Sequence, residues 1–315
     1  MLPPFGPIVP PTSTLNPQPS TLNPQPSTLN PQPITLNDAP PQPKPLAKKA
    51  QRHLPEPSPN LWPWTSANTA ANPPTPEPPP PGAREATRPH EHIYILGGGN
   101  IGRFLAVTLA KSRPAPAVTL VVNSEAQLSY CSETDVKIVT CPESSTTAPV
   151  NVEYWSENPP PRGGGESPQT IPPLHNVIVA TKAAQAMPAV DRIRRYLSPG
   201  CSVLLAQNGV CRLWPPGVDE YVAERWTRVE DAPRFMTGVV THGLFAKDYA
   251  TSVYASPGEI IFGSVSDAAS TSEAEASQKS DPVTNSFLAR CFLSAPDLHA
   301  RLTPPKHSGS CSSKN

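Results

Sequence analysis

Residues 92–110 read HIYILGGGNIGRFLAVTLA: a short apolar run typical of a strand, a glycine-rich turn, and an apolar run typical of a helix. The turn has the spacing G-x-G-x-x-G. In this pattern Gly97 allows a tight turn, Gly99 lets backbone amides approach a pyrophosphate, and Gly102 lets the helix pack closely on the strand. The free N–H groups and the positive dipole end at the start of a helix also favour a phosphate. The stretch therefore predicts a dinucleotide-binding unit, with the phosphates held by Gly97, Gly98, Gly99, Asn100, Ile101 and Gly102.

Further apolar runs downstream are typical of strands, and a helical stretch is expected at 183–197. The strand-like runs are residues 118–122, 176–180, 202–206 and 259–263. This alternation predicts an α/β fold, a Rossmann-like doubly wound parallel sheet. Ligands of such sheets bind outside the carboxyl ends of the strands, so Gly99, Lys182 and Asn208 should face one crevice. Taken singly, Lys182 is also consistent with a solvated lysine at a helix start, and Asn208-Gly209 with an ordinary turn.

The tip of the second strand, Asn123-Ser124, lies 24 residues after Gly99, where dinucleotide folds read the adenosine ribose. An NAD enzyme usually carries Asp or Glu there to bind the 2′-hydroxyl, whereas neutral donors or an Arg suit a 2′-phosphate. Asn123 and Ser124 therefore favour NADP as the cofactor, although Glu125 lies beside them and no Arg is present.

The N-terminal segment cannot form a packed domain, because residues 1–90 hold 27 of the 47 prolines in the chain of 315 residues. Within this disordered Pro-rich arm, residues 14–37 repeat the heptad TLNPQPS, in which the prolines exclude a helix and favour polyproline II. The repeat is consistent with a ligand for an aromatic groove or with a spacer. The apolar patch Leu61–Trp64 is expected to dock on the following domain. The predicted segments are an arm at 1–90, an NADP-binding domain at 91–263 with a loop insertion at about 156–173, and a third segment at 264–315.

Composition excludes several classes of protein. Lys+Arg and Asp+Glu both number 25, so the charge favours neither nucleic acid nor an anionic membrane as a partner. Six scattered cysteines without a CxxC pair predict reduced thiols and no metal site. No apolar run approaches the roughly 20 residues of a membrane helix, and the N-terminus lacks a secretory signal. We expect a cytoplasmic protein, with the mitochondrion as the alternative because residues 1–37 contain no acid.

Over residues 91–305 the chain resembles the ketopantoate reductases, the 2-dehydropantoate 2-reductase family, in its fungal type. The segments that carry the resemblance occur in the family's order. They are HIYILGGGNIGRFLA (92–106), NVIVATKAAQA (176–186), VLLAQNGV (203–210), TGVVTHGLFA (237–246), EIIFG (259–263) and LARCFLSAPDLHARLTPP (288–305). The resemblance implies that Gly97 to Gly102 hold the NADP pyrophosphate and that Lys182 contacts cofactor and substrate. It also implies that Asn208 binds the nicotinamide side and the 2-oxo acid, and that the backbone of Gly243 lies against the cofactor.

The chain departs from the family at two places. By this resemblance, a His-Arg pair is expected where this chain has Asn123-Ser124. The family's helical second domain opens with a helix of the type K-L-x-x-N-x-x-x-N-P, whose Lys is the general acid. Residues 306–315 read KHSGSCSSKN and do not match it. We therefore expect a C-terminally truncated member that carries only a stub of the second domain and no catalytic Lys helix.

The resemblance implies NADPH-dependent reduction of 2-dehydropantoate to pantoate, a step of pantothenate biosynthesis, with little turnover by this chain alone. The alternative is a non-enzymatic NADP-binding module. In the stub, Phe287, Leu288, Phe292 and Leu293 have helical spacing. Because a second domain would cover them, we expect them to lie uncovered here, or to form a contact in a homo-oligomer.

Overall fold

The computed structural model describes residues 58–69, 89–140, 144–161, 170–209, 218–265 and 285–303. All of them belong to one compact unit, His53–Asn315. The strands are β1 (Trp62–Trp64), β2 (His92–Leu96), β3 (Ala117–Val122), β4 (Lys137–Thr140), β5 (Ser144–Thr147), β6 (Asn151–Ser156), β7 (Leu174–Val179), β8 (Leu197–Ala206), β9 (Arg234–Val240), β10 (Gly243–Ala246), β11 (Thr251–Ser256), β12 (Ile260–Ser264) and β13 (Ala300–Leu302).

The α-helices are α1 (Ser66–Thr69), α2 (Asn100–Lys111), α3 (Glu125–Glu133), α4 (Ala183–Ile193), α5 (Val218–Arg225) and α7 (Phe287–Ser294). Short 3₁₀ helices are η1 (Pro89–Glu91), η2 (Arg194–Tyr196), η4 (Val229–Asp231) and η5 (Pro296–Leu298). The helix expected at 183–197 is therefore shorter. Its last turn is η2, and Leu197 already begins β8.

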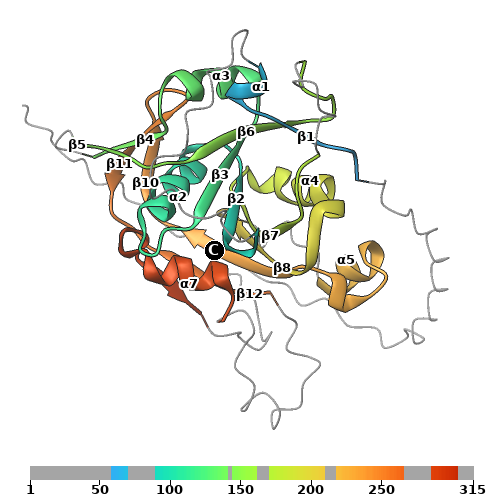
Figure 1. Ribbon diagram of the computed structural model, residues 1–315. Coiled ribbons are helices and arrows are strands. Elements are labelled where there is room, and N and C mark those ends of the chain that lie inside the picture. Colours follow the sequence, from blue (N-terminus) through green and yellow to red (C-terminus); the bar gives the residue numbers. More distant parts are fainter. Residues whose placement is uncertain are drawn as a thin grey trace, which may run out of the picture. The chain divides into compact units, whose positions relative to one another are not determined.

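The main sheet has the order β1-β6-β3-β2-β7-β8-β9-β12-β13. From β6 to β9, all neighbouring strands pair in parallel. The strand order reverses between β2 and β7, which is the arrangement of a doubly wound Rossmann sheet. Figure 1 shows α2 on one side of the central strands and α4 and α5 on the other. The predicted α/β fold is confirmed, with a mainly parallel mixed sheet.

The strands are apolar on both faces because both faces are covered. Along β2, Ile93 and Ile95 enter the core beneath α2, whereas Tyr94 and Leu96 enter the core beneath α4. Helix α4 buries Ala186, Val190 and Ile193, a helical spacing that directs one stripe at the sheet.

Both ends of the sheet are built from segments remote in sequence. Strand β1 pairs antiparallel with β6, and Leu61 just before it is fully buried. The expected docking of Leu61–Trp64 is thus confirmed. At the other end, β12 pairs antiparallel with β9 and parallel with β13. Residues 58–69 and 89–90 of the predicted Pro-rich arm therefore belong to the ordered fold, which corrects the expectation that the arm is disordered up to residue 90, and residues 1–57 and 70–88 lie outside the described residues.

A second sheet of four strands, in the order β10-β11-β4-β5, packs against α2. Strands β10 and β11 form an antiparallel hairpin, and β11 pairs in parallel with β4. The sequence analysis does not predict this sheet.

Two expectations about exposed segments are corrected. Leu288 and Phe292 are 1% and 0% exposed and belong to the core beneath α2, because α7 packs on the extended sheet. Of the four side chains expected to lie uncovered, Leu293 is exposed and Phe287 packs partly on that core. Within the predicted loop insertion, Ile171 is also buried and its N–H binds the carbonyl of Leu61. In the third predicted segment, 264–315, residues 266–284 lie outside the described residues.

Candidate functional site

The carboxyl ends of the central strands meet at one edge of the sheet. The register pairs Leu96 of β2 with Val179 of β7, and Val179 with Leu205 of β8. Strand β9 continues the series, since Ala206 pairs with Gly238. The glycine turn, the start of α4 and the Gln207-Asn208 segment therefore follow neighbouring strands, at the edge where doubly wound sheets bind ligands.

Backbone atoms restrict Gly97 and Gly102 in the glycine turn, a Cβ at Gly98 would lie 2.6 Å from Gln127 Nε2, and Gly99 is open. Gly97 has φ +115°, and a Cβ there would lie 2.9 Å from the carbonyl oxygen of Ala180. A Cβ on Gly102 would overlap the carbonyl oxygen of Gly97. At Gly99, by contrast, a Cβ would meet no atom within 4 Å, and φ is −75°. Gly99 is exposed at the N-cap of α2 and opens onto space in front of the free helix amides.

A polar network lies behind the first turn of α2. The Arg103 guanidinium is 3% exposed and donates to Ser252 Oγ (2.9 Å), to the carbonyl of Asp248 (2.7 Å) and to Asn100 Oδ1 (2.7 Å). Ser252 Oγ also donates to Asn100 Oδ1 at 2.9 Å. Burial lowers the pKa of Arg103 from its ordinary value. The network ties the start of α2 to the β10–β11 hairpin.

Gln127 holds the other side of the turn. Its Nε2 donates to the carbonyls of Gly98 (2.8 Å) and Tyr249 (3.2 Å), and its Oε1 accepts from the Asn123 N–H at 3.4 Å. Ser124 is the N-cap of α3, and its Oγ accepts from the Gln127 N–H at 3.2 Å. Asn123 and Ser124 are both exposed, so their side chains lie at the surface beside the turn. The sequence gives no signal for this role of Gln127, because the carbonyls of Gly98 and Tyr249 lie 29 and 122 residues away in the chain.

Lys182 and Asn208 follow β7 and β8, as the strand pattern predicts. Lys182 is the exposed N-cap residue of α4 and makes no side-chain cap bond. The Asn208 carboxamide binds the backbone of Val240, donating to its carbonyl at 2.9 Å and accepting from its N–H at 3.1 Å. Asn208 therefore joins the ends of β8 and β9, and the substrate contact implied by resemblance stays a prediction.

Gln207 is a residue at this edge that the sequence analysis missed. It is 3% exposed, and within the described part of the chain neither Nε2 nor Oε1 has a hydrogen-bond partner. The only signal available was its place in the Gln-Asn-Gly segment already singled out for Asn208.

Gly243 begins β10, three residues after β9 ends. A Cβ on Gly243 would overlap Ser256 Oγ, so packing within the hairpin already requires glycine there. The neighbouring His242 is buried and holds this turn. Its Nε2 lies 3.0 Å from the carbonyl of Leu298, and its Nδ1 accepts from the Gly258 N–H at 3.1 Å.

A family model described as ketopantoate reductase PanE/ApbA matches residues 93–267. The chain belongs to this family. It is 38% identical over 184 residues to a ketoisovalerate reductase of Gibberella intermedia, covering 58% of this chain and 47% of that protein. It is 27% identical over 159 residues to a probable 2-dehydropantoate 2-reductase of Schizosaccharomyces pombe, covering 49% of this chain and 41% of that protein. The chain spans about half the length of the curated relatives that it matches.

Among solved structures, a probable 2-dehydropantoate 2-reductase of Bacillus subtilis aligns with a TM-score of 0.46 and 17% identity, covering 68% of this chain and 58% of that one. The match to the ketopantoate reductase family model confirms the resemblance that the sequence motifs indicate.

The residues of this ketopantoate reductase family member fit a dinucleotide at the sheet edge. The open position at Gly99 and the free amides of α2 suit a diphosphate, and no acidic side chain occupies the first turn of α2. Asn123 and Ser124, exposed beside the turn, lie where the ribose is expected.

A cavity of about 360 Å³ lies elsewhere, on the flank of α2 that faces the second sheet. Phe104 and Tyr254 form part of its wall, and Lys111, Asp297 and His299 also line it. None of the predicted site residues lines this cavity, so it is separate from the sheet edge.

For disulfides, metal sites and membrane helices, the structure informs only on the described part of the chain. Cys131, Cys201 and Cys291 are buried and unbridged, and burial raises the pKa of these thiols to about 11, about 12 and about 11. These three are unreactive as thiols at neutral pH. Among the described residues no cluster could hold a metal ion, and none of their helices is long and apolar enough to cross a membrane.

Proposed function

We propose that the sheet edge around Gly99 binds NADPH and serves the reduction of a branched 2-oxo acid to the 2-hydroxy acid. The observation that carries this proposal is the open space at Gly99. Packing explains why Gly97 and Gly102 are glycines, but nothing in the described ranges of the chain requires a glycine at position 99. A ligand that comes close to the backbone at the start of α2 supplies the reason.

The reaction moves a hydride from the nicotinamide of NADPH to the 2-oxo carbon, and a proton to the carbonyl oxygen. Lys182 lies at the edge as an exposed cation, suited to an anionic group of cofactor or substrate. The proton donor implied by resemblance belongs to a helix that residues 306–315 do not match. The second candidate, from a different class of protein, is a dinucleotide-binding module without turnover of its own.

Two observations favour different substrates. The family motifs favour 2-dehydropantoate, as expected from the sequence. The greater identity to ketoisovalerate reductases, 38% against 27% for the fission yeast 2-dehydropantoate reductase, favours 2-ketoisovalerate. Both are branched 2-oxo acids. NADP is preferred over NAD because the exposed tip after β3 carries Asn123 and Ser124 and no acid at those two positions.

The variant Gly99→Ala tests the cofactor site. Its methyl group meets no protein atom within 4 Å, and its φ of −75° suits any residue. We expect an unchanged melting temperature and an affinity for NADPH that is weaker by about tenfold or more, or about 1.4 kcal/mol. Fluorescence titration measures the affinity. Equal affinity for NADPH in both proteins would contradict a diphosphate at Gly99.

Turnover separates the two candidates. Loss of NADPH absorbance is followed with 2-dehydropantoate and, separately, with 2-ketoisovalerate, and the hydroxy acid is identified by mass spectrometry. Formation of either product supports the reductase and selects its substrate. Binding of NADPH without consumption supports the binding module, whereas no binding of NADPH removes both candidates.

A further inference from the structure

The carboxamide of Asn100 has a fixed orientation at the first residue of α2. Its Oδ1 accepts two hydrogen bonds, from Arg103 Nη2 at 2.7 Å and from Ser252 Oγ at 2.9 Å. A guanidinium only donates, so the oxygen and not the nitrogen must face Arg103. The Nδ2 amino group then points the other way, and among the described residues it has no hydrogen-bond partner.

Arg103 is a buried cation whose hydrogen-bond acceptors are all neutral. They are a hydroxyl, an amide oxygen and the backbone carbonyl of Asp248. The carboxylate of Asp248 is turned to the N–H groups of Ala250 and Thr251, at 2.8 and 2.6 Å. Within the described residues Arg103 has no carboxylate bound to it. The Asp248 carboxylate acts on Arg103 only through space. A buried charge is costly unless opposite charges compensate it, so a further anion near the start of α2 would stabilise this arrangement.

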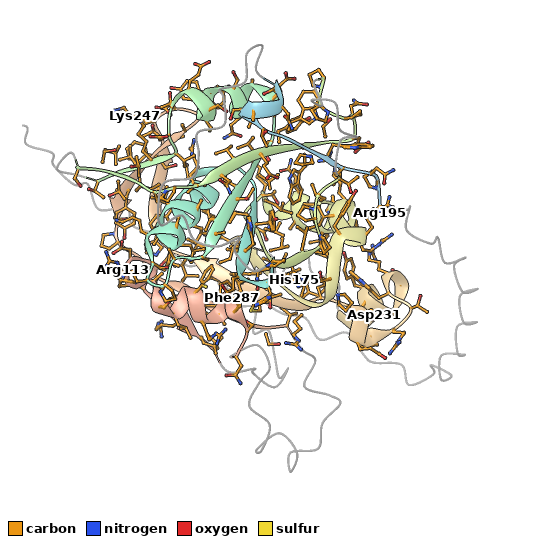
Figure 2. The ribbon with its side chains drawn as sticks, viewed as in Figure 1. Arg113, His175, Arg195, Asp231, Lys247 and Phe287 are labelled. Carbon is orange, nitrogen blue, oxygen red and sulfur yellow. The ribbon has the colours of Figure 1, made fainter. Side chains whose placement is uncertain are left out.

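One element supports the glycine turn from both sides. The β10–β11 hairpin supplies Ser252 and the Asp248 carbonyl to Arg103, and the Tyr249 carbonyl to Gln127, which in turn binds the Gly98 carbonyl. Figure 2 marks Lys247 at the tip of this hairpin, next to α3. The second sheet thus fixes the geometry of a turn that belongs to the first sheet.

We propose that Ser252 and Arg103 are positioning residues for the cofactor diphosphate. They hold the Asn100 amino group toward a phosphate oxygen, and Arg103 adds a buried positive charge behind the turn that no carboxylate contacts directly among the described residues. This inference rests on the proposed function, because the anion that it needs is the diphosphate of NADPH. It adds residues of α2 and β11 that the glycine pattern does not contain.

A double-mutant cycle between Ser252 and Asn100 tests the positioning. Ser252→Ala removes one of the two bonds that orient the carboxamide, and Asn100→Ala removes the donor. Each single variant should weaken NADPH binding by about fivefold, the effect of one hydrogen bond. Adding Ser252→Ala to Asn100→Ala should cause no further loss, because Ser252 acts through Asn100. Independent, multiplying losses would overturn the proposal.

The variant Asn100→Asp separates binding from stability. Its carboxylate accepts the same two bonds and compensates Arg103, so the melting temperature should rise. The donor is lost and a negative charge is added, so NADPH binding should weaken by about tenfold or more. An unchanged affinity for NADPH would overturn the inference even if the Ser252 variant does not fold.

The proposed function and the positioning proposal are overturned by different results. If the unmodified chain does not bind NADPH, or if Gly99→Ala binds it equally well, the proposed function fails. If the unmodified chain binds NADPH and Gly99→Ala weakens binding, but the Ser252 and Asn100 effects multiply, only the positioning proposal fails.

Discussion

Gln207 carries two hydrogen-bonding atoms into the protein interior, and the residues that the structure describes provide no partner for either. Burying such groups unsatisfied costs about 1–3 kcal/mol, and an apolar side chain of similar shape avoids this cost. We therefore expect Gln207→Met to raise the free energy of unfolding by about 1–3 kcal/mol. Thermal and urea unfolding of the ligand-free protein measure the change.

The matched control is Gln185→Met, the same substitution at an exposed position of α4. Its carboxamide is in contact with solvent, so its removal should leave the melting temperature unchanged. A loss of stability in Gln207→Met would mean that the carboxamide has a partner after all.

Residue by residue, the sequence predicts the positions that depend on local backbone geometry. The spacing of the turn predicts that Gly97 and Gly102 must be glycines. A Cβ at Gly102 would overlap the nearby Gly97 carbonyl, and a Cβ at Gly97 would meet Ala180 at the end of the adjoining strand. The partner of Asn208 could not be predicted, since Val240 lies 32 residues away and is reached only through the pairing of β8 with β9. Arg103 was predicted as part of a helix, but its burial depends on Ser252, which is 149 residues distant.

At the scale of elements, His242 joins the β9–β10 turn, the β11–β12 loop and η5. The Leu298 carbonyl can only accept, so Nε2 carries the proton, and Nδ1 accepts from the Gly258 N–H. Burial lowers the pKa of His242 from 6.5, and the nearby His299 lowers it further. The hydrogen bond to the Leu298 carbonyl raises the pKa but does not outweigh burial. At neutral pH this shift favours the neutral ring in the folded protein.

This pKa shift predicts the direction of a pH dependence. The unfolded chain binds a proton on His242 at higher pH than the folded chain does. The contribution of His242 to the free energy of unfolding is therefore complete above about pH 6.5. It falls as the pH decreases from there toward the pKa of His242 in the folded protein. In His242→Gln the fall in the free energy of unfolding between neutral and mildly acidic pH should be smaller. Urea unfolding across this range measures it. Part of the fall should remain, because burial also lowers the pKa of His92. Equal pH profiles for both proteins would contradict the assignment.

The sequence predicts those strands and helices whose buried side chains form a continuous or periodic apolar run. The central strands are apolar on both faces and were found from sequence, whereas the second sheet was not. Strand β5 is Ser-Ser-Thr-Thr and largely exposed, and β10 has only four residues. Short polar strands contain no hydrophobic period, so their pairing depends on contacts that only the folded chain supplies.

At the scale of the molecule, the segment 285–303 extends a core whose main strands lie 20 residues or more upstream. Phe292 of α7 is fully buried with its ring centroid 5.4 Å from that of Phe262 in β12, and β13 pairs in parallel with β12. The sequence suggested helical spacing here but not what the helix covers, because an apolar stripe does not identify its partner.

If α7 belongs to the cooperative unit, Phe292→Ala should lower the free energy of unfolding by about 3–5 kcal/mol, the cost of truncating a buried aromatic ring. Leu293→Ala is the matched control on the same helix, since Leu293 is 47% exposed and its truncation should cost well under half as much. Unfolding followed by tryptophan fluorescence and by circular dichroism should give coincident, single transitions for both variants. A separate early transition in Phe292→Ala, with the stability of the remaining protein unchanged, would instead show that α7 and β13 form an independent appendage. The coincident result is expected because Phe292 packs within the same cluster as Ile93 and Leu105, so that losing its ring weakens the core beneath α2 as a whole.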